Sequence, residues 1–551
     1  MTDEAFLRCE VEPYIDTFYS HSPILKRHRD AAAIHLLRTF EDWIRFGMLK
    51  PDRRPVQSWA RLRWAHEAIP WALRWIWRDC PLSGNPSREM NWDAYGEAAE
   101  LLDLGFKYNH LVRCFTLYSR GFFTAEASKE QKRVSFFFRS QEEQQRDAVS
   151  LIYSILKDDV PIPDALTKFL RVAMPVINTV FPSYIDKTSE ISICYQTPPD
   201  MLAYFKDWAR LQANAMPFDL PSEWHFGAYS LAQFRFFWMS LLAASLAHIT
   251  AHGVADAQIG TRGGAIGSLV MEMNEAALLR IGEIFPIPME AMRSLLNLLV
   301  YEPKRNFWDP FWQPIIAVSG GQYLVAPHLI ITSSPERNLI TLLNRSAPGR
   351  AFYNRVSSQK EMEQLNGLCQ LFPSPRFVVR KRVAVNRSDG STLTDVDLMV
   401  YEATAAVLLL VHAKWLIGPD SVQEVLSKDE EVKSALAIAA KAASRIAETG
   451  TGWLSAVLDA ELRNSLEIRS LIINRDFIPS GWVYDQRIPI VNTDFVTKFV
   501  RSPQFTGLDS LYAACAGFYE HLVKRHPIKL DREEIRYGDY LFDFPTVEQG
   551  N

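Results

Sequence analysis

The chain has 551 residues, of which 48% are hydrophobic and 23% charged, and its formal net charge is -4. This composition is typical of a soluble globular protein and excludes a disordered or collagen-like chain, while the length predicts two to four domains. The net charge gives no overall attraction to nucleic acid, so any such binding would need a local basic patch.

Several features predict a cytoplasmic protein that has no membrane segment. The first residues, MTDEAFLRCE, are acidic and lack the basic and apolar segments of a secretory signal. The longest uncharged apolar stretch of the N-terminal half, residues 236–247, is shorter than the roughly 20 residues that a spanning helix needs. The six cysteines form no CxxC pair, which argues against a zinc site or a disulfide framework.

Residues 1–300 have apolar residues at three- and four-residue spacing, which predicts a helical region that senses a signal or binds a partner protein. His248 and His252 have the i, i+4 spacing that zinc sites use on helices. The HExxH glutamate is absent, and the pattern favours two structural histidines. Residues 301–347 predict a connector that contains a β-hairpin turning at Gly320-Gly321.

Residues 348–551 predict an α/β domain with a central mixed sheet and a C-terminal helix. The expected order is a helix over 353–372, a strand over 376–385, a hairpin over 394–415, a helical block over 421–448, strands over 468–476 and 487–492, and a helix over 507–525. The expected fold class is therefore a multidomain protein with a mainly α N-terminal region and a C-terminal α/β domain.

The hairpin TDVDLMVYEATAAVLLLVHAKW carries two acids on its first arm and a histidine and a lysine on its second. If the turn pairs Ala403 with Ala406, Asp397 lies opposite His412 and Asp395 lies opposite Lys414. Because residues two apart and residues directly opposed share a face, the four side chains are expected to meet at the open end of the hairpin. A carboxylate and a second ligand there would hold a divalent cation, and the lysine would stabilise charge on a phosphate.

This order of elements around TDVDLMVY and AVLLLVHAKW resembles the PD-(D/E)xK, or restriction-endonuclease-like, nuclease superfamily. The resemblance covers residues 348 to about 500. It implies a metal-binding Asp at Asp397, a catalytic Lys at Lys414 and a helix acid at Glu361 or Glu363, of which Glu361 is nearer the apolar face of its helix. It also implies a divalent metal, Mg²⁺ or Mn²⁺, and nucleic acid as substrate, DNA before RNA. A helical region fused to such a domain is similar to prokaryotic restriction and anti-phage proteins.

His412 stands where this superfamily usually has Glu or Gln. Imidazole ligates metals without adding negative charge, so Asp397 and His412 as metal ligands would shift preference from Mg²⁺ toward Mn²⁺, Co²⁺ or Zn²⁺. Two functions therefore remain open: a metal-dependent nuclease, or a decayed nuclease-like module that binds nucleic acid or a protein without cutting.

Two further features near this hairpin have alternative interpretations. Asp395 is either a second metal or water contact or a strand terminator. Arg380, Lys381 and Arg382, on the strand before the hairpin, form either a strip that contacts phosphates or the charged edge of a sheet.

Overall fold

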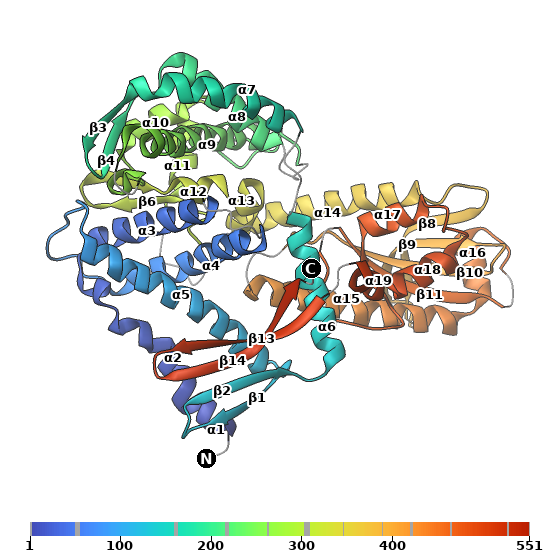
Figure 1. The fold of residues 1–551 in the computed structure, drawn as a ribbon. Coiled ribbons are helices and arrows are strands. Elements are labelled where there is room, and N and C mark those ends of the chain that lie inside the picture. Colours follow the sequence, from blue (N-terminus) through green and yellow to red (C-terminus); the bar gives the residue numbers. More distant parts are fainter. Residues whose placement is uncertain are drawn as a thin grey trace.

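The computed structural model describes the chain with the following exceptions: residues 1–2, 50–54, 159–163, 215–219, 262–263, 302–308, 345–346, 388, 419–421, 463–464, 476, 526–527 and 550–551. It is a mixed α/β protein in which a large, mainly helical part carries an α/β part at one side (Figure 1). The expected division into a helical N-terminal region and a C-terminal α/β region is confirmed at this coarse level.

The mainly helical part is built from amphipathic helices around two large hydrophobic cores. Its helices are α1 (Asp3–Phe6), α2 (Glu12–Phe18), α3 (Arg29–Leu49), α4 (Pro55–Asp79), α5 (Trp92–Ser119), α6 (Gln141–Asp158), α7 (Asp164–Val180), α8 (Pro199–Asn214), α9 (Leu231–Val254), α10 (Glu275–Gly282), α11 (Met289–Leu299), α12 (Pro327–Ile331) and α13 (Pro335–Leu343). Helices α3, α4 and α5 pack side by side, with α7 to α11 above them in the view of Figure 1.

Helix α9 runs through the centre of one of these cores. It begins at a capping box in which Ser230 and Gln233 satisfy each other's backbone N–H groups. Together with the turn that follows, it is long and apolar enough to cross a bilayer by length and composition, but 78% of the relevant window is buried inside the protein. Packing in the core therefore accounts for its apolar character.

The predicted hairpin at Gly320-Gly321 is confirmed. Strands β6 (Ile315–Val318) and β7 (Gln322–Val325) pair antiparallel, and both glycines have positive φ angles that suit the tight turn. Strand β5 (Met271–Asn274) adds to β7, so the connector shares a sheet with the region before residue 300. A separate hairpin joins β3 (Ile185–Ser189) to β4 (Ser192–Tyr195).

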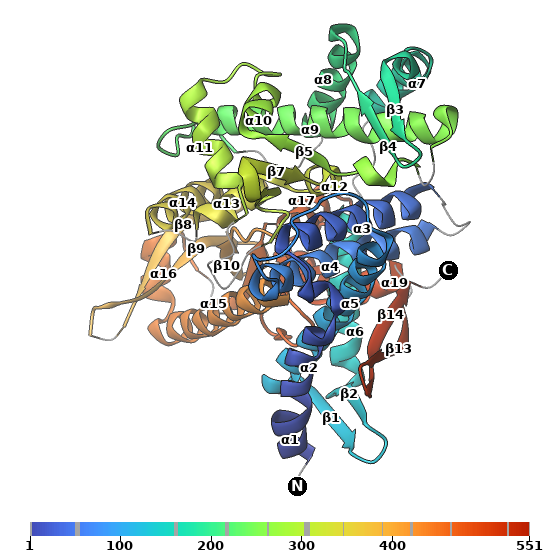
Figure 2. The ribbon, with the colours of Figure 1, turned by 90° about the vertical axis from the view of Figure 1, so that its left-hand side faces the viewer.

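The two ends of the chain meet in a four-stranded sheet of order β1-β2-β14-β13. Its strands are β1 (Phe123–Ser128), β2 (Arg133–Phe138), β13 (Ile528–Tyr537) and β14 (Tyr540–Gln549). Strand β14 pairs parallel with β2, and Phe542 and Phe136 share one buried cluster with the N-terminal helices. Residues 528–549 therefore belong with the N-terminal part, and the expected domain from 348 to 551 is corrected at its C-terminal end (Figure 2).

The α/β part contains a five-stranded mixed sheet of order β12-β11-β10-β9-β8. The chain enters through α14 (Ala347–Cys369), makes the antiparallel meander β8 (Phe377–Asn386), β9 (Thr392–Glu402) and β10 (Val407–Lys414), and crosses over through α15 (Val422–Thr449) and α16 (Thr451–Leu458) to β11 (Glu467–Asn474) and β12 (Ile490–Asn492). Strands β10, β11 and β12 are parallel. Helices α17 (Thr493–Val500), α18 (Leu508–Ala516) and α19 (Phe518–Arg525) follow.

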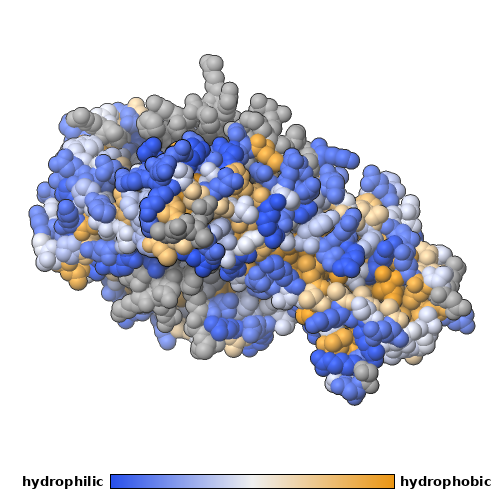
Figure 3. Space-filling view, turned by 90° about the horizontal axis from the view of Figure 1, so that it is seen from below, coloured by the Kyte–Doolittle hydropathy of each residue, from blue (hydrophilic) through white to orange (hydrophobic). Residues whose placement is uncertain are grey.

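Helices cover both faces of this sheet. The first face packs on α14, α17 and α18 through a core that includes Leu365, Leu398 and Leu511. The second face packs on α15 and α16 through two further clusters. Double cover explains why VLLLV in β10 is apolar at every position. Seen from below, the surface is mostly hydrophilic, and its hydrophobic residues are most evident toward the right, where the α/β part lies (Figure 3).

Candidate active site

The register of the central hairpin is the predicted one. Val407 pairs with Glu402, and the pairing runs to Val411 opposite Leu398. There the two strands separate: β10 continues beside β11 as far as Lys414, and β9 continues beside β8. The Ala413 N–H is left without a partner from β9, and the Asp397 carboxylate accepts a hydrogen bond from it at 2.9 Å. Asp397 therefore caps the ladder at the fork between β9 and β10.

Strand β9 changes the face it presents at Asp397. Val396 packs in the cluster on the α15 side, whereas Leu398, two residues later, packs on the α14 side. Residues two apart in a regular strand share a face, so the backbone must turn between them. The facing residue of β8, Arg382, has a φ of 50°, a left-handed conformation that is uncommon for a residue with a side chain. The irregularity at Arg382 and Asp397 turns the Asp397 side chain toward α14.

Glu361 of α14 reaches the same place. Its carboxylate is half-buried and accepts a hydrogen bond from the Trp415 N–H, directly after β10. Burial raises the pKa of Glu361, the negative charge of Asp397 raises it further, and the positive charges of Lys414 and Arg382 oppose this. The pKa of Asp397 is also raised by burial, against its bond from Ala413 and the charges of Lys414 and Arg382. Two carboxylates and two cations thus form one interacting group.

His412 lies on the other face of the sheet. It is next to Ile472 of β11, which packs with Val432 and Ala439 of α15. The His412 side chain is 3% exposed, and its Nε2 has no hydrogen-bond partner among the described residues. Burial lowers the pKa of His412 to about 4, and the charge of Lys414 contributes to this lowering, so the ring is neutral at pH 7.

The structure therefore corrects the expectation that the four polar side chains of the hairpin share one face. The register would place Asp397 opposite His412, but pairing of β9 with β10 ends at Leu398 and Val411, and the turn in β9 directs the carboxylate away from the imidazole. Asp395 is exposed and acts on Asp397 through its charge alone. The residue that joins Asp397 and Lys414 is Glu361, the one of the two candidate helix acids that was expected nearer the apolar face of its helix.

The donor set of this group suits a hard divalent cation. Mg²⁺ is commonly held by one or two carboxylates together with waters and substrate phosphates, and Glu361 and Asp397 can provide the carboxylates. Within the described ranges, no three His, Cys, Asp or Glu side chains cluster as a complete metal cage. An ion here would thus depend on water or substrate oxygens for its remaining ligands.

The predicted basic strip is mostly engaged in structure. Arg380 donates hydrogen bonds to the Val457 and Leu458 carbonyls and so caps the end of α16. Lys381 donates to Asn366 of α14 at 2.8 Å. Arg382 is the one member of the strip whose charge acts on both Glu361 and Asp397.

Sequence reasoning missed Gln364, one turn after Glu361. Its amide nitrogen donates to the Ile473 carbonyl of β11 at 3.2 Å and to the Thr493 hydroxyl at 2.9 Å. These bonds fix α14 against the sheet and so set the position of Glu361. The i, i+3 spacing of the two residues was the available signal, because it places both on one side of a helix.

The two histidines with zinc-like spacing are structural, as favoured. His248 and His252 are buried, and the centroids of their rings lie 4.5 Å apart. His248 bonds the Tyr195 hydroxyl and the Ser268 and Leu269 carbonyls, and His252 bonds the Gly264 carbonyl.

Comparison with known proteins adds no relative: no protein-family model, no curated protein and no solved structure matches the chain.

Proposed function

We propose that the chain is a metal-dependent nuclease that hydrolyses phosphodiester bonds, with DNA as its preferred substrate. The observation that carries the proposal is the convergence of Glu361, Asp397 and Lys414 at the fork between β9 and β10. The order of α14, an antiparallel three-stranded meander, a crossover helix and a parallel fourth strand supports it, because it resembles the PD-(D/E)xK core.

Each residue has a chemical role in this proposal. Glu361 and Asp397 would hold Mg²⁺ or Mn²⁺, which when bound polarises a phosphate and makes a water more acidic. The charge of Lys414 acts on both carboxylates, so its ammonium group is near enough to offset negative charge that develops on a phosphate under attack. Arg382 adds a second cation on the same side, and the Ala413 N–H keeps the Asp397 carboxylate in place.

The helical N-terminal region would then act as a sensor or bind a partner protein that controls cutting in the cytoplasm. Fusion of such a region to a nuclease is similar to restriction and anti-phage systems. This part of the proposal rests on architecture alone.

A second function is favoured by His412. The His412 ring is neutral and faces α15, so the site has two carboxylates, Glu361 and Asp397. The PD-(D/E)xK superfamily that the chain resembles has a third acidic or amide side chain, at the position of His412. A decayed site of this kind would bind nucleic acid without cutting it.

Cleavage assays separate the two functions. The wild type should nick supercoiled plasmid or cut labelled oligonucleotides in Mg²⁺ or Mn²⁺, and a chelator should abolish cutting. Asp397→Asn and Lys414→Met should each lower the rate at least about 100-fold, since removing one transition-state stabiliser costs roughly this much in comparable sites. The control is Lys498→Met, which changes an exposed lysine on α17. Binding without cutting in every metal would favour the decayed module.

A further inference from the structure

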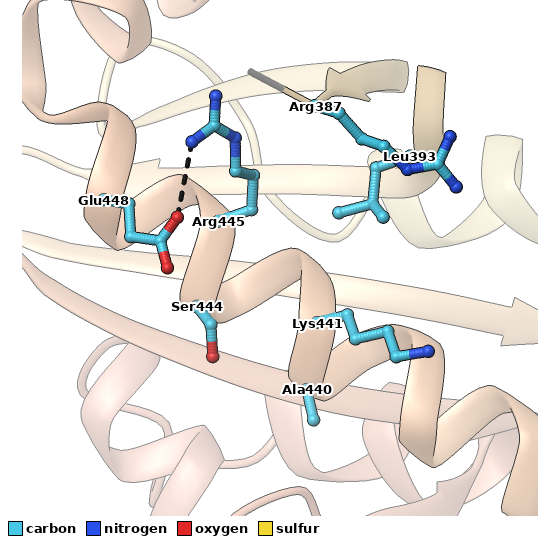
Figure 4. A pocket seen from close by; sticks show the side chains of 7 residues that line it. All are labelled: Arg387, Leu393, Ala440, Lys441, Ser444, Arg445 and Glu448. Carbon is cyan, nitrogen blue, oxygen red and sulfur yellow. Dashed lines mark hydrogen bonds and ion pairs between the residues drawn. The ribbon is translucent and has the colours of Figure 1, made fainter. Parts of the chain in front are cut away.

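A second basic surface lies close to the candidate active site. It is a hollow of about 510 Å³ between the outer end of the β8–β9 hairpin and one side of α15, lined by Arg387, Leu393, Ala440, Lys441, Ser444, Arg445 and Glu448. Figure 4 shows Arg387 and Leu393 coming from the strand side and the other five from successive turns of the helix.

The charges of this hollow are only partly compensated. Arg445 donates to the Asn386 carbonyl at 2.9 Å and pairs with Glu448 at 3.3 Å, which fixes the helix against the hairpin. Arg387 donates to the Ser391 hydroxyl and the Thr392 carbonyl, and its charge also acts on the exposed Asp389 carboxylate of the same turn. Lys441 is exposed and has no ion pair among the described residues. The lining residues carry three cations and one carboxylate, and with Asp389 beside Arg387 the hollow and its rim keep one net positive charge.

The hollow and the site share one end of the sheet. Leu393 and Asp397 are four residues apart on β9, which is about 13 Å at the usual rise of a strand. One strand of duplex DNA carries a phosphate about every 3.4 Å along its axis, so this separation spans at most about four nucleotides of a bound strand. A strand held by the hollow would pass round the end of the sheet and reach the two carboxylates.

We propose that Arg387, Lys441 and Arg445, with the Ser444 hydroxyl, bind the phosphate backbone of the nucleic acid several nucleotides from the bond that is cut. This inference rests on the proposed function and gives the substrate a second point of attachment. It assigns to the hollow the role that the sequence suggested for Arg380, Lys381 and Arg382.

The test measures binding apart from cutting. Fluorescence anisotropy follows a labelled single-stranded DNA, and in a parallel arm an RNA of the same sequence, on Asp397→Asn protein that cannot cleave the probe. Lys441→Glu with Arg387→Glu should weaken binding at least about tenfold and reduce the slope of log affinity against log salt by about two, because each substitution removes the cation that neutralises one phosphate. Lys441→Gln alone, which keeps a polar side chain of similar length, should give about half of that change in slope. The control, Lys498→Glu on α17, reverses one charge away from the hollow and should have no effect.

Equal affinity and equal salt slope in the hollow variants and the control would overturn the inference. Failure of the nuclease proposal gives a different result: wild-type protein would not cut in any metal, yet the hollow variants would still bind the probe more weakly. A larger decrease in affinity in the DNA arm than in the RNA arm would identify DNA as the nucleic acid held by the hollow.

Discussion

At the scale of single residues, the candidate site depends on burial and on which face each side chain takes. Glu361 and Asp397 are two carboxylates that burial makes harder to ionise, and Lys414 and Arg382 offset that cost. His412 is buried on the opposite face, its Nε2 has no hydrogen-bond partner among the described residues, and burial makes a proton there unfavourable. Burial therefore raises the pKa of the carboxylates on one face of the sheet and lowers the pKa of His412 on the other.

His412 is expected to make the protein less stable in mild acid. Its pKa is about 4 in the folded protein, against about 6.5 when unfolded, so between these values the unfolded state binds more protons. The contribution of neutral His412 to the free energy of unfolding is fully present above about pH 6.5. It is lost as the pH falls toward 4, and the loss is about 3 kcal/mol at most. Urea midpoints of wild type and His412→Gln at pH 7 and pH 5 measure this. Between pH 7 and pH 5 the His412→Gln variant should lose less stability than the wild type. Equal losses of stability in the two proteins would contradict the burial of His412.

At the scale of elements, the turn at Arg382 and Asp397 decides which residues meet. A conformation with φ of 50° costs a residue with a side chain about 1 kcal/mol, whereas glycine adopts it freely. A β-branched residue opposes it more strongly. The turn should thus tolerate glycine and resist valine.

Arg382→Gly and Arg382→Val form a matched pair, because both remove the same charge. We expect the glycine variant to keep cleavage within about tenfold of wild type, since only one exposed charge is lost. The valine variant should lose considerably more, because a regular strand would turn Asp397 away from Glu361. Equal rates in the two variants would show that the turn does not position Asp397.

The turn at Arg382 and Asp397 is also the feature of the hairpin that the sequence did not predict. The apolar runs of TDVDLMVY and AVLLLVHAKW and the turn between them were enough to predict both strands and their register, because local pattern and turn position determine these features. The face of Asp397 depended on an irregular residue in β8, a neighbouring strand, which no pattern within the hairpin reveals. The pairing of residues 528–549 with β2 was missed for a similar reason, because it joins segments about 400 residues apart.

At the scale of the whole molecule, the α/β part is tied to the N-terminal part. Helix α6 packs on it: Val149 lies in the core beside α14, Arg146 donates to the Gly481 carbonyl at 2.9 Å, and Ser150 donates to the Ile478 carbonyl at 3.0 Å. Gly481 is in close contact, since a Cβ there would lie 2.2 Å from the Asp147 nitrogen.

These contacts predict that a fragment of residues 348–527 is much less stable than the same region in the full chain. Without α6, the apolar surface around Ile478 and Tyr519 would be exposed to water. Thermal melting and binding of a hydrophobic dye, compared between fragment and full protein, measure this. Gly481→Ala in the full chain should weaken the same contact, and a fragment that melts cooperatively at the full protein's temperature would contradict it.

We propose that Glu361 and Asp397, and not His412, hold the metal ion near Lys414. Isothermal calorimetry of Mn²⁺ binding tests this assignment directly, because it needs no catalysis. The proteins to compare are the wild type, Glu361→Gln, Asp397→Asn and His412→Gln. We predict that each carboxamide variant binds Mn²⁺ at least about tenfold more weakly, because it loses one of two anionic ligands. The His412→Gln variant should bind Mn²⁺ as the wild type does. Loss of binding in His412→Gln together with unchanged binding in Glu361→Gln would contradict the account.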